Sequence, residues 1–283
     1  ETGGEPFLGG APLNLAAHLC KQGAQAALVS AVGNDTLGRN ALEQIRKIGL
    51  DIHAIATLAD HPTGTVTARL DENKVATYDF AEDTAYDHIP LPQIDTDIDL
   101  FCFGTLAQRS PESRETLRKL RASLDCLFFY DVNLRQNFYS REILEESLNA
   151  ADIVKLNEDE FPVLASMFGL PDDPEEFRRR FGLLFVLLTL RQDSLSGGPG
   201  QSREHSRRGR FVQRRIPVSL PDRLVPCGCS CGRKPSCSEN RRTKRRNLRR
   251  SAMDGDDFRV LGADIYFRSG FPFAIAKYNH TQK

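Results

Sequence analysis

The sequence has no long apolar run, because none of its hydrophobic stretches reaches the roughly 20 residues that a membrane-spanning helix requires. Its N-terminus is acidic and has no basic segment followed by an apolar one, so no secretory signal is predicted. Cys20, Cys102 and Cys126 stand singly in apolar segments, which is typical of reduced core cysteines. We therefore expect a soluble, cytoplasmic protein with no membrane partner.

A net charge is also lacking, because 38 basic residues balance 38 acidic ones. The balance hides two unlike parts: residues 1–190 carry 17 Lys and Arg against 30 Asp and Glu, and residues 191–283 carry 21 against 8. Hydrophobic residues make up 40% of the chain, enough for a substantial core. We divide it into an α/β core over 1–190 and a divergent basic tail, rich in cysteine and arginine, over 191–283.

Short β-type runs alternate with helical patterns in the core, as expected for a mainly parallel sheet flanked by helices. We expect strands at 26–32, 100–103, 126–131, 153–156 and 183–190, and helices after Gly10 and at 35–48, 110–124 and 140–149. Ser110 is expected to cap its helix. Two alternating segments, 64–70 and 75–80, flank a polar turn and predict a β-hairpin.

The periodic pattern ends after Leu190, where Arg, Ser, Gly and Pro become dominant. We predict disorder over about 195–255, since so few apolar residues cannot offset the entropy of ordering. The basic run 240–250 is interpreted as solvated rather than as a nucleic-acid site, because no aromatic residue interleaves it. Our hypothesis is that the tail is translated out of frame; a naturally degenerate chain is the alternative.

Two further groups of residues invite comparison with metal sites. Four cysteines lie within eleven positions, at Cys227, Cys229, Cys231 and Cys237, but the paired spacing of structural zinc sites is absent. The histidines His18, His61, His88 and His205 have no mutual spacing that indicates a metal or a catalytic triad. We interpret each of them as an ordinary surface or packed residue.

Glycines and an amide stand where the first helix is expected to begin, at Gly9, Gly10 and Asn14. Glycine lets a ligand approach the backbone, the helix start offers free N–H groups, and an amide side chain both donates and accepts. These properties suit a small polar ligand, although an ordinary loop-to-helix turn uses the same residue types.

Polar side chains also follow two of the expected strands. Asp131, Asn133 and Arg135 come at the end of one, and Asn157 and Glu160 at the end of another. Ligands of parallel sheets bind beyond such strand ends. A guanidinium binds phosphate oxygens in a fork, and an acid with an amide supplies the oxygen ligands that a hard cation prefers. The alternatives are a solvated, salt-bridged loop and an ordinary acidic helix start.

The spaced set Gly9-Gly10, Asn14, Gly23 and Gly33 resembles the N-terminal signature of the phosphofructokinase-B type, or ribokinase-like, carbohydrate kinases. The Asp-x-Asn-x-Arg run at 131–135 and the Asn-x-x-Glu core at 157–160 are similar to further motifs of that family. Residues 102–110 resemble the strand-exit segment of its fructokinase-type members, and the likeness covers about residues 7–190.

The resemblance implies a ribokinase-like α/β fold with a small β-hairpin lid at about 64–80, and an enzyme that transfers the γ-phosphate of ATP to a sugar hydroxyl with Mg²⁺. It implies sugar contacts at Gly9, Gly10, Asn14, Gly104 and Arg135. It further implies nucleotide or phosphate contacts at Asp131, Asn133 and Asn157, and metal contacts at Asn157 and Glu160. A homodimer through the lid, whose Val66 and Val75 are apolar, would also suit this arrangement.

One part of the family pattern is missing. After Thr189-Leu190 the family continues with a Thr-x-Gly-x-x-Gly nucleotide loop and a Gly-Ala-Gly-Asp segment that carries the catalytic base. This chain has Arg191-Gln192-Asp193-Ser194 instead, and no equivalent of the second segment follows. The catalytic group is therefore unassigned, and two interpretations stay open: a sugar kinase whose present chain is inactive, and a non-catalytic sugar-binding remnant.

Overall fold

The computed structural model describes residues 7–70, 76–94, 98–189 and 273–277. Most of the tail lies outside the described residues. The predicted disorder over 195–255, the out-of-frame hypothesis and the cysteine-rich stretch all concern that part of the chain. Within the described residues, no helix has both the length and the apolar character needed to cross a membrane.

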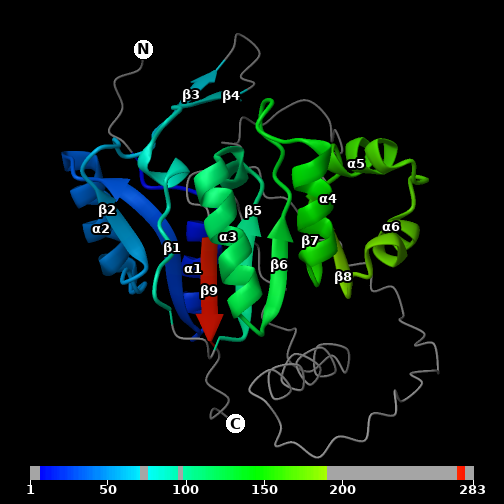
Figure 1. The fold of residues 1–283 in the computed structure, drawn as a ribbon, viewed down its shortest axis with the longest axis horizontal. Coiled ribbons are helices and arrows are strands. Elements are labelled where there is room, and N and C mark those ends of the chain that lie inside the picture. The colour runs from blue at the N-terminus through cyan, green and yellow to red at the C-terminus, as the bar shows by residue number, and fades with distance from the viewer. Residues whose placement is uncertain (1–6, 71–75, 95–97, 190–272, 278–283) are drawn as a thin grey trace, which may run out of the picture.

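A seven-stranded sheet forms the centre of the molecule, in the order β2-β1-β9-β5-β6-β7-β8 (Figure 1). Its strands are β1 (Gln25–Gly33), β2 (Ile55–Leu58), β5 (Leu100–Gly104), β6 (Leu127–Asp131), β7 (Ile153–Asn157), β8 (Phe185–Thr189) and β9 (Phe273–Lys277). Neighbouring strands run parallel, except that β9 is antiparallel to both β1 and β5. The predicted mainly parallel sheet is confirmed, while β2 and β9 are additions to it.

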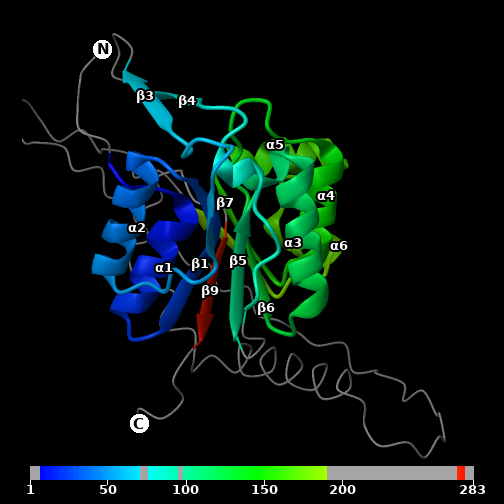
Figure 2. The same ribbon diagram turned by 60° about the vertical axis from the view of Figure 1, so that its left-hand side comes forward.

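Helices cover both faces of this sheet (Figure 2). One face carries α1 (Ala11–Lys21) and α2 (Thr36–Ile48). The other carries α3 (Pro111–Ser123), α4 (Arg141–Ala150), α5 (Glu160–Phe168) and α6 (Pro174–Phe181). Two short 3₁₀ turns, η1 (Ala85–Asp87) and η2 (Leu106–Arg109), precede α3.

The core consists of two apolar clusters, one on each side of the sheet. Strand β6 shows the principle, because Leu127 and Phe129 belong to one cluster and Phe128 and Tyr130 to the other. Alternate residues of a strand point to opposite faces, so a strand buried on both faces is apolar throughout. This explains the continuous apolar runs from which the strands are predicted.

Two predicted helix starts have different outcomes. Asp35 caps α2 by accepting a hydrogen bond from the Gly38 amide at 2.7 Å, and Gly49 ends the helix with a left-handed φ of 88°. Ser110 occupies the N-cap position of α3, but its side chain makes no capping bond. Its hydroxyl instead donates to the Asp87 carbonyl, so the predicted side-chain cap is wrong.

The predicted hairpin is confirmed as β3 (Val66–Leu70) and β4 (Ala76–Phe80), a separate two-stranded sheet. Figures 1 and 2 show it projecting beyond the carboxyl ends of the parallel strands. The segment that enters it is fixed by Asp35, whose carboxylate accepts from the Thr63 amide at 2.8 Å and the Thr63 hydroxyl at 2.7 Å. A Cβ at Gly33 would lie 2.6 Å from the Thr63 nitrogen, so this close approach requires glycine.

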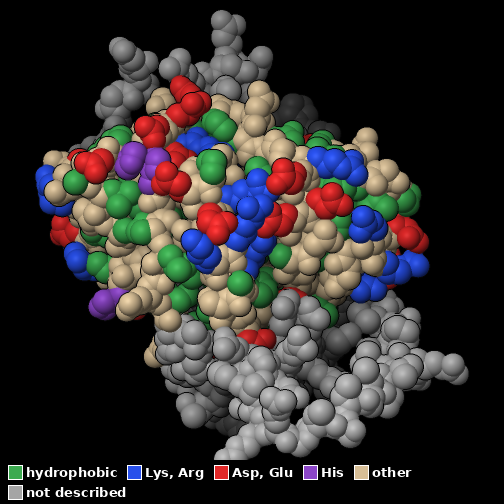
Figure 3. All heavy atoms as spheres, in the orientation of Figure 1, with side chains coloured by type: hydrophobic (Ala, Val, Ile, Leu, Met, Phe, Trp, Pro, Cys, Tyr) green, Lys and Arg blue, Asp and Glu red, His purple; other side chains and the backbone are tan. Residues whose placement is uncertain are grey.

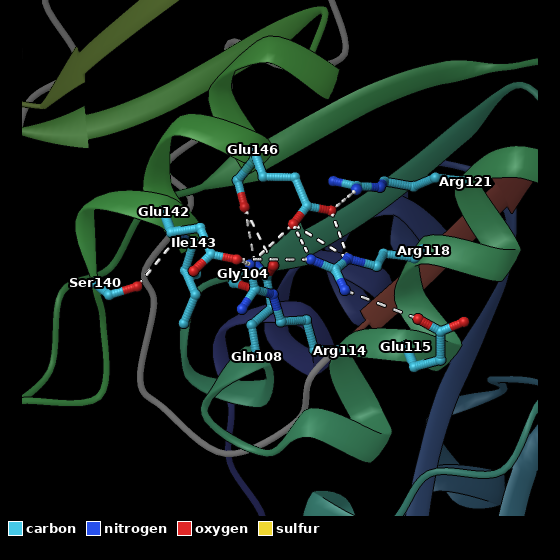
Figure 4. A network of polar contacts seen from close by, with 11 residues as sticks. Gly104, Gln108, Arg114, Glu115, Arg118, Arg121, Ser140, Glu142, Ile143 and Glu146 are labelled. Atoms are coloured by element: carbon cyan, nitrogen blue, oxygen red, sulfur yellow. Dashed lines mark hydrogen bonds and ion pairs between the residues drawn. The ribbon is translucent and has the colours of Figure 1, made fainter.

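Helices α3 and α4 are joined by a charge network centred on Glu146 (Figure 4). Its carboxylate accepts from Arg114 at 3.0 Å, Arg118 at 2.7 Å and Arg121 at 2.5 Å. Basic and acidic side chains lie side by side on this face of the molecule (Figure 3). The Arg118 hydrogen bond, with the two other guanidiniums, lowers the pKa of Glu146 to about 2.

We expect Glu146→Gln to lower the free energy of unfolding by about 1–3 kcal/mol, because three guanidiniums lose their shared carboxylate. The pKa of this carboxyl is about 2 in the folded chain against 4.5 ordinarily, so its stabilisation is complete above pH 4.5 and is lost as the pH falls toward 2. Urea unfolding at several pH values measures both effects. Glu43→Gln is the control, since the one salt bridge of Glu43 among the described residues is to exposed Lys47. Equal losses in the two variants would contradict the assignment.

Candidate active site

Polar residues gather at one edge of the sheet. Strand β5 ends at Gly104, β6 at Asp131, β7 at Asn157 and β8 at Thr189. The register pairs Gly104 with Asp131 and Asn157 with Thr189, so the four strand ends lie side by side. Helix α1 comes immediately before β1 and runs back along it, which places the start of α1 at this same edge. The carboxyl edge is where ligands bind in open parallel sheets.

The start of α1 depends on glycine. Gly10 is the N-cap, with φ 137° and ψ 140°, a conformation that residues with a side chain rarely adopt. Asn14 lies on the first turn, and its backbone N–H donates a hydrogen bond to the Gly10 carbonyl at 2.9 Å. The first turn of α1 holds no acidic residue. The positive end of this helix is therefore not neutralised by a first-turn carboxylate.

Asp131 forms a buried ion pair that the sequence did not reveal. Lys155 Nζ donates to Asp131 Oδ1 at 2.8 Å, and the two residues are only 8% and 5% exposed. The second oxygen, Asp131 Oδ2, is buried with no hydrogen-bond partner among the described residues. Buried polar atoms are almost always satisfied, so an unpartnered carboxylate oxygen fits a ligand or a cation at this position. The signal for Lys155 was a charge inside an otherwise apolar strand.

Glu160 and Asn157 hold one another and the neighbouring loop. The Glu160 carboxylate accepts hydrogen bonds from the backbone N–H of Asn157 at 2.9 Å and from the backbone N–H of Leu134 at 3.0 Å. Asn157 Oδ1 accepts in return from the Glu160 amide N at 2.8 Å. Burial raises the pKa of Glu160, to which the Asp131 charge adds. The residues predicted to contact a metal are thus together, and each Glu160 oxygen already accepts one backbone amide.

The loop after β6 turns toward the hairpin. Asn133 has a left-handed φ of 44° and Gln136 one of 43°, and Gln136 Nε2 donates to the Tyr78 carbonyl of β4 at 2.9 Å. The Arg135 guanidinium lies 5.8 Å from the centre of the Tyr78 ring. Its Nε is buried with no hydrogen-bond partner among the described residues, which suits an additional acceptor such as an anion.

The structure brings together two of the histidines whose sequence spacing indicates no common site. His61 and His88, which are 27 positions apart, have stacked rings whose centres are 3.6 Å apart. Sequence spacing does not show contacts that are made through a hairpin. The hairpin lies between them in the chain and returns the second histidine to the first.

The fold and the site define a class of protein: an α/β domain whose polar site lies at the carboxyl ends of parallel strands, next to a separate hairpin. A family model for pfkB family carbohydrate kinases matches residues 4–184, and the chain belongs to this family. The resemblance inferred from the sequence is confirmed.

The chain is also similar to individual kinases of this kind. It is 32% identical over 168 residues to an uncharacterized sugar kinase of Pyrococcus horikoshii, covering 55% of this chain and 54% of that protein. It is 26% identical over 173 residues to a fructokinase of Salmonella typhimurium, covering 56% and 55%. The chain spans about half the length of these relatives.

Solved structures agree on the fold. The P. horikoshii kinase in complex with ATP superposes with a TM-score of 0.57 and 25% identity, over 77% of this chain and 68% of that one. The apo fructokinase of Vibrio cholerae O395 gives a TM-score of 0.57 and 24% identity, over 65% and 66%. The ribokinase-like fold implied by the resemblance is therefore confirmed.

We expect Lys155→Met to lower the free energy of unfolding by about 3–5 kcal/mol, because it leaves the Asp131 carboxylate buried without its cation. The double variant Lys155→Met/Asp131→Leu should recover much of this loss, since neither buried charge then remains. Lys119→Met is the control, because Lys119 is exposed and pairs only loosely with Glu115. Denaturant unfolding measures all three variants. If Lys155→Met lowers the free energy of unfolding no more than the control does, the ion pair does not contribute to stability as a buried pair.

Proposed function

We propose that this protein phosphorylates a sugar hydroxyl with ATP, as a fructokinase-like carbohydrate kinase. The observation that carries the proposal is the meeting of the α1 start, the Asp131–Lys155 pair and the Asn157–Glu160 pair at one edge of the sheet. Family membership and relatives that are named sugar kinase and fructokinase support it.

The start of α1 supplies the sugar side of the proposed site. Gly9 and Gly10 leave the backbone open to a ligand, and the Asn14 amide both donates and accepts, as a sugar hydroxyl does. Gly104 at the end of β5 adds a position without a side chain. Leaving a sugar hydroxyl unpaired in a closed site costs about 1–3 kcal/mol, so a few such contacts are enough to select among sugars.

The exits of β6 and β7 supply the nucleotide side. Asn133, Asn157 and Arg135 offer donors to phosphate oxygens, while Asp131 is an anion and needs a cation between itself and a phosphate. Mg²⁺ fits this donor set, because it takes oxygen ligands and keeps several waters. We assign it, through water, to Asn157, whose Oδ1 already accepts two backbone amides, and to Glu160, with the unpartnered Asp131 oxygen as a further anchor. When bound, the ion neutralises charge on the transferring phosphate.

A non-catalytic sugar-binding remnant is the second candidate, and a specific observation favours it. Thr189 ends β8 beside Asn157, at the site itself, and the sequence that follows lacks both the nucleotide-loop glycines and the Gly-Ala-Gly-Asp segment. Loss of a general base alone slows a reaction by about 10²–10⁴-fold. Sequencing the coding DNA around Leu190 tests the related out-of-frame hypothesis, since another reading frame should then restore the missing motifs.

We expect Asn14→Ala to weaken fructose binding about tenfold and leave Mg²⁺–ATP binding unchanged, because one sugar-facing amide is lost. Asn157→Ala should do the opposite. Calorimetric titration of each ligand measures both, with Asn149→Ala on the exposed face of α4 as the control.

The same titrations separate the two candidates when ADP formation is followed with a panel of sugars. A kinase binds both ligands and forms ADP only when its sugar is present. A remnant binds sugar and forms no ADP. A chain that binds neither ligand is incompatible with both candidates.

We further propose a homodimer formed through the β3–β4 hairpin, and a location in the cytoplasm. A hairpin that projects from the body offers its free strand edges to a second copy. Among the described residues Cys20, Cys102 and Cys126 form no disulfide, which agrees with a reducing compartment.

A further inference from the structure

Three side chains with metal-ligating atoms meet at the base of the hairpin. His61, Asp83 and His88 each place a ligand atom within 4.8 Å of those of the other two. His88 Nε2 lies 2.7 Å from Asp83 Oδ1, and His61 Nδ1 lies 3.6 Å from the same oxygen. Ligand atoms that share one metal at bonds of about 2.0–2.2 Å stand about 3.3 Å apart, so these distances lie on either side of the required separation.

The kinds of ligand atom point to a transition metal. Two imidazoles with one carboxylate are typical of zinc and its neighbours in the first transition row, whereas Mg²⁺ and Ca²⁺ prefer oxygen ligands throughout. The two histidine side chains are 26% and 21% exposed, and the Asp83 side chain is 78% exposed. An ion can therefore enter from solvent and keep water as its remaining ligand.

Glu112 provides the outer support that metal-binding histidines usually have. Its Oε2 lies 2.8 Å from His88 Nδ1, the ring nitrogen on the side away from Asp83. A carboxylate at this position holds the proton on Nδ1, so that Nε2, which hydrogen-bonds to Asp83 Oδ1 in the structure, can exchange that bond for a metal. The charges also balance, because Asp83 and Glu112 bring two negative charges to two imidazoles that are neutral when they bind a divalent ion. Figure 3 shows histidine side chains beside acidic ones on the upper left of this face.

We propose that His61, Asp83 and His88 form a site for a divalent transition-metal ion such as Zn²⁺, and that this ion fixes the hairpin to the body of the protein. His61 precedes β3 and Asp83 follows β4, so the ion holds both ends of the hairpin. His88 follows η1, and Glu112 belongs to α3, so the remaining contacts come from the body. In the structure the two imidazole rings are stacked with their centres 3.6 Å apart, so one ring must turn before both direct a nitrogen at the same ion. The site does not depend on sugar kinase activity.

The test is a calorimetric titration of the full chain with Zn²⁺, in the presence of excess Mg²⁺. We expect His61→Ala and His88→Ala each to bind one ion fewer than the wild type. Glu112→Ala should weaken that site about 10–100-fold, as loss of an outer-shell partner does. His53→Ala is the matched control, because His53 also pairs with an aspartate, Asp51, but has no second histidine beside it in the described part of the chain. Any ions held by cysteines in the tail are common to all variants and cancel in the comparison.

Two further measurements address folding and the hairpin. Asp83→Asn changes an exposed side chain and keeps its size, so it provides a variant of the site without a change in the core. Co²⁺ should give visible absorption bands that are lost in Asp83→Asn and His88→Ala and kept in His53→Ala. Amide exchange in β3 and β4 should slow on addition of Zn²⁺ in the wild type only.

The same ion count in the wild type and in His88→Ala would overturn the proposal, as would displacement of Zn²⁺ by Mg²⁺. Neither result would bear on phosphoryl transfer, which the sugar and ATP titrations measure separately.

Discussion

The buried carboxylate of Glu160 is the interaction on which the site depends. It accepts hydrogen bonds from two backbone N–H groups, that of Leu134 in the loop after β6 and that of Asn157 at the end of β7. Without it, two strand exits would have unsatisfied amides and no fixed spacing. Burial raises the pKa of Glu160, so holding the charged form here has a cost in stability. That cost is typical of positions at which geometry is retained for function.

The hairpin is connected to this edge through a second set of contacts. Arg109 donates to both Asp87 oxygens at 2.7 Å and lies 4.7 Å from the centre of the Phe138 ring. Phe138 in turn meets Phe80 at the end of β4, edge to face. The loop that carries Asn133 and Arg135 is therefore packed against the hairpin base. A movement of the hairpin would therefore also shift the groups proposed to contact phosphate.

The sequence predicted the parts of the structure that follow from local rules. Short apolar runs predicted the strands of the sheet, and the helical pattern over 35–48 predicted α2, because these signals need no distant partner. The strand exits at Gly104, Asp131 and Asn157 followed from the general rule for parallel sheets. Contacts between distant segments were not predictable in this way. The Lys155–Asp131 pair depends on strand register, and the His61–His88 stack depends on the return of a hairpin.

The β9 strand shows the same limit at the level of the sheet. It comes from a part of the chain whose composition predicts no regular structure, and it pairs antiparallel with β1 and β5. A run of five residues is too short to show a periodic pattern, so its strand conformation depends on hydrogen bonding to the two neighbouring strands. Composition predicts the preference of an isolated segment, whereas strand formation within a sheet also depends on the neighbouring strands.

Ligand binding and turnover depend on different parts of this chain. The groups proposed for sugar, phosphate and metal come from α1, β5, β6 and β7, whose positions are set by the two apolar clusters and by Glu160. Strands β5 to β8 all precede Leu190, whereas β9, which joins β1 to β5, comes from beyond it, as the family's nucleotide loop and base would. A change beyond Thr189 that spares β9 can therefore abolish phosphoryl transfer and leave the ends of β6 and β7 in place, because no described contact of Asp131, Asn157 or Glu160 comes from beyond β8.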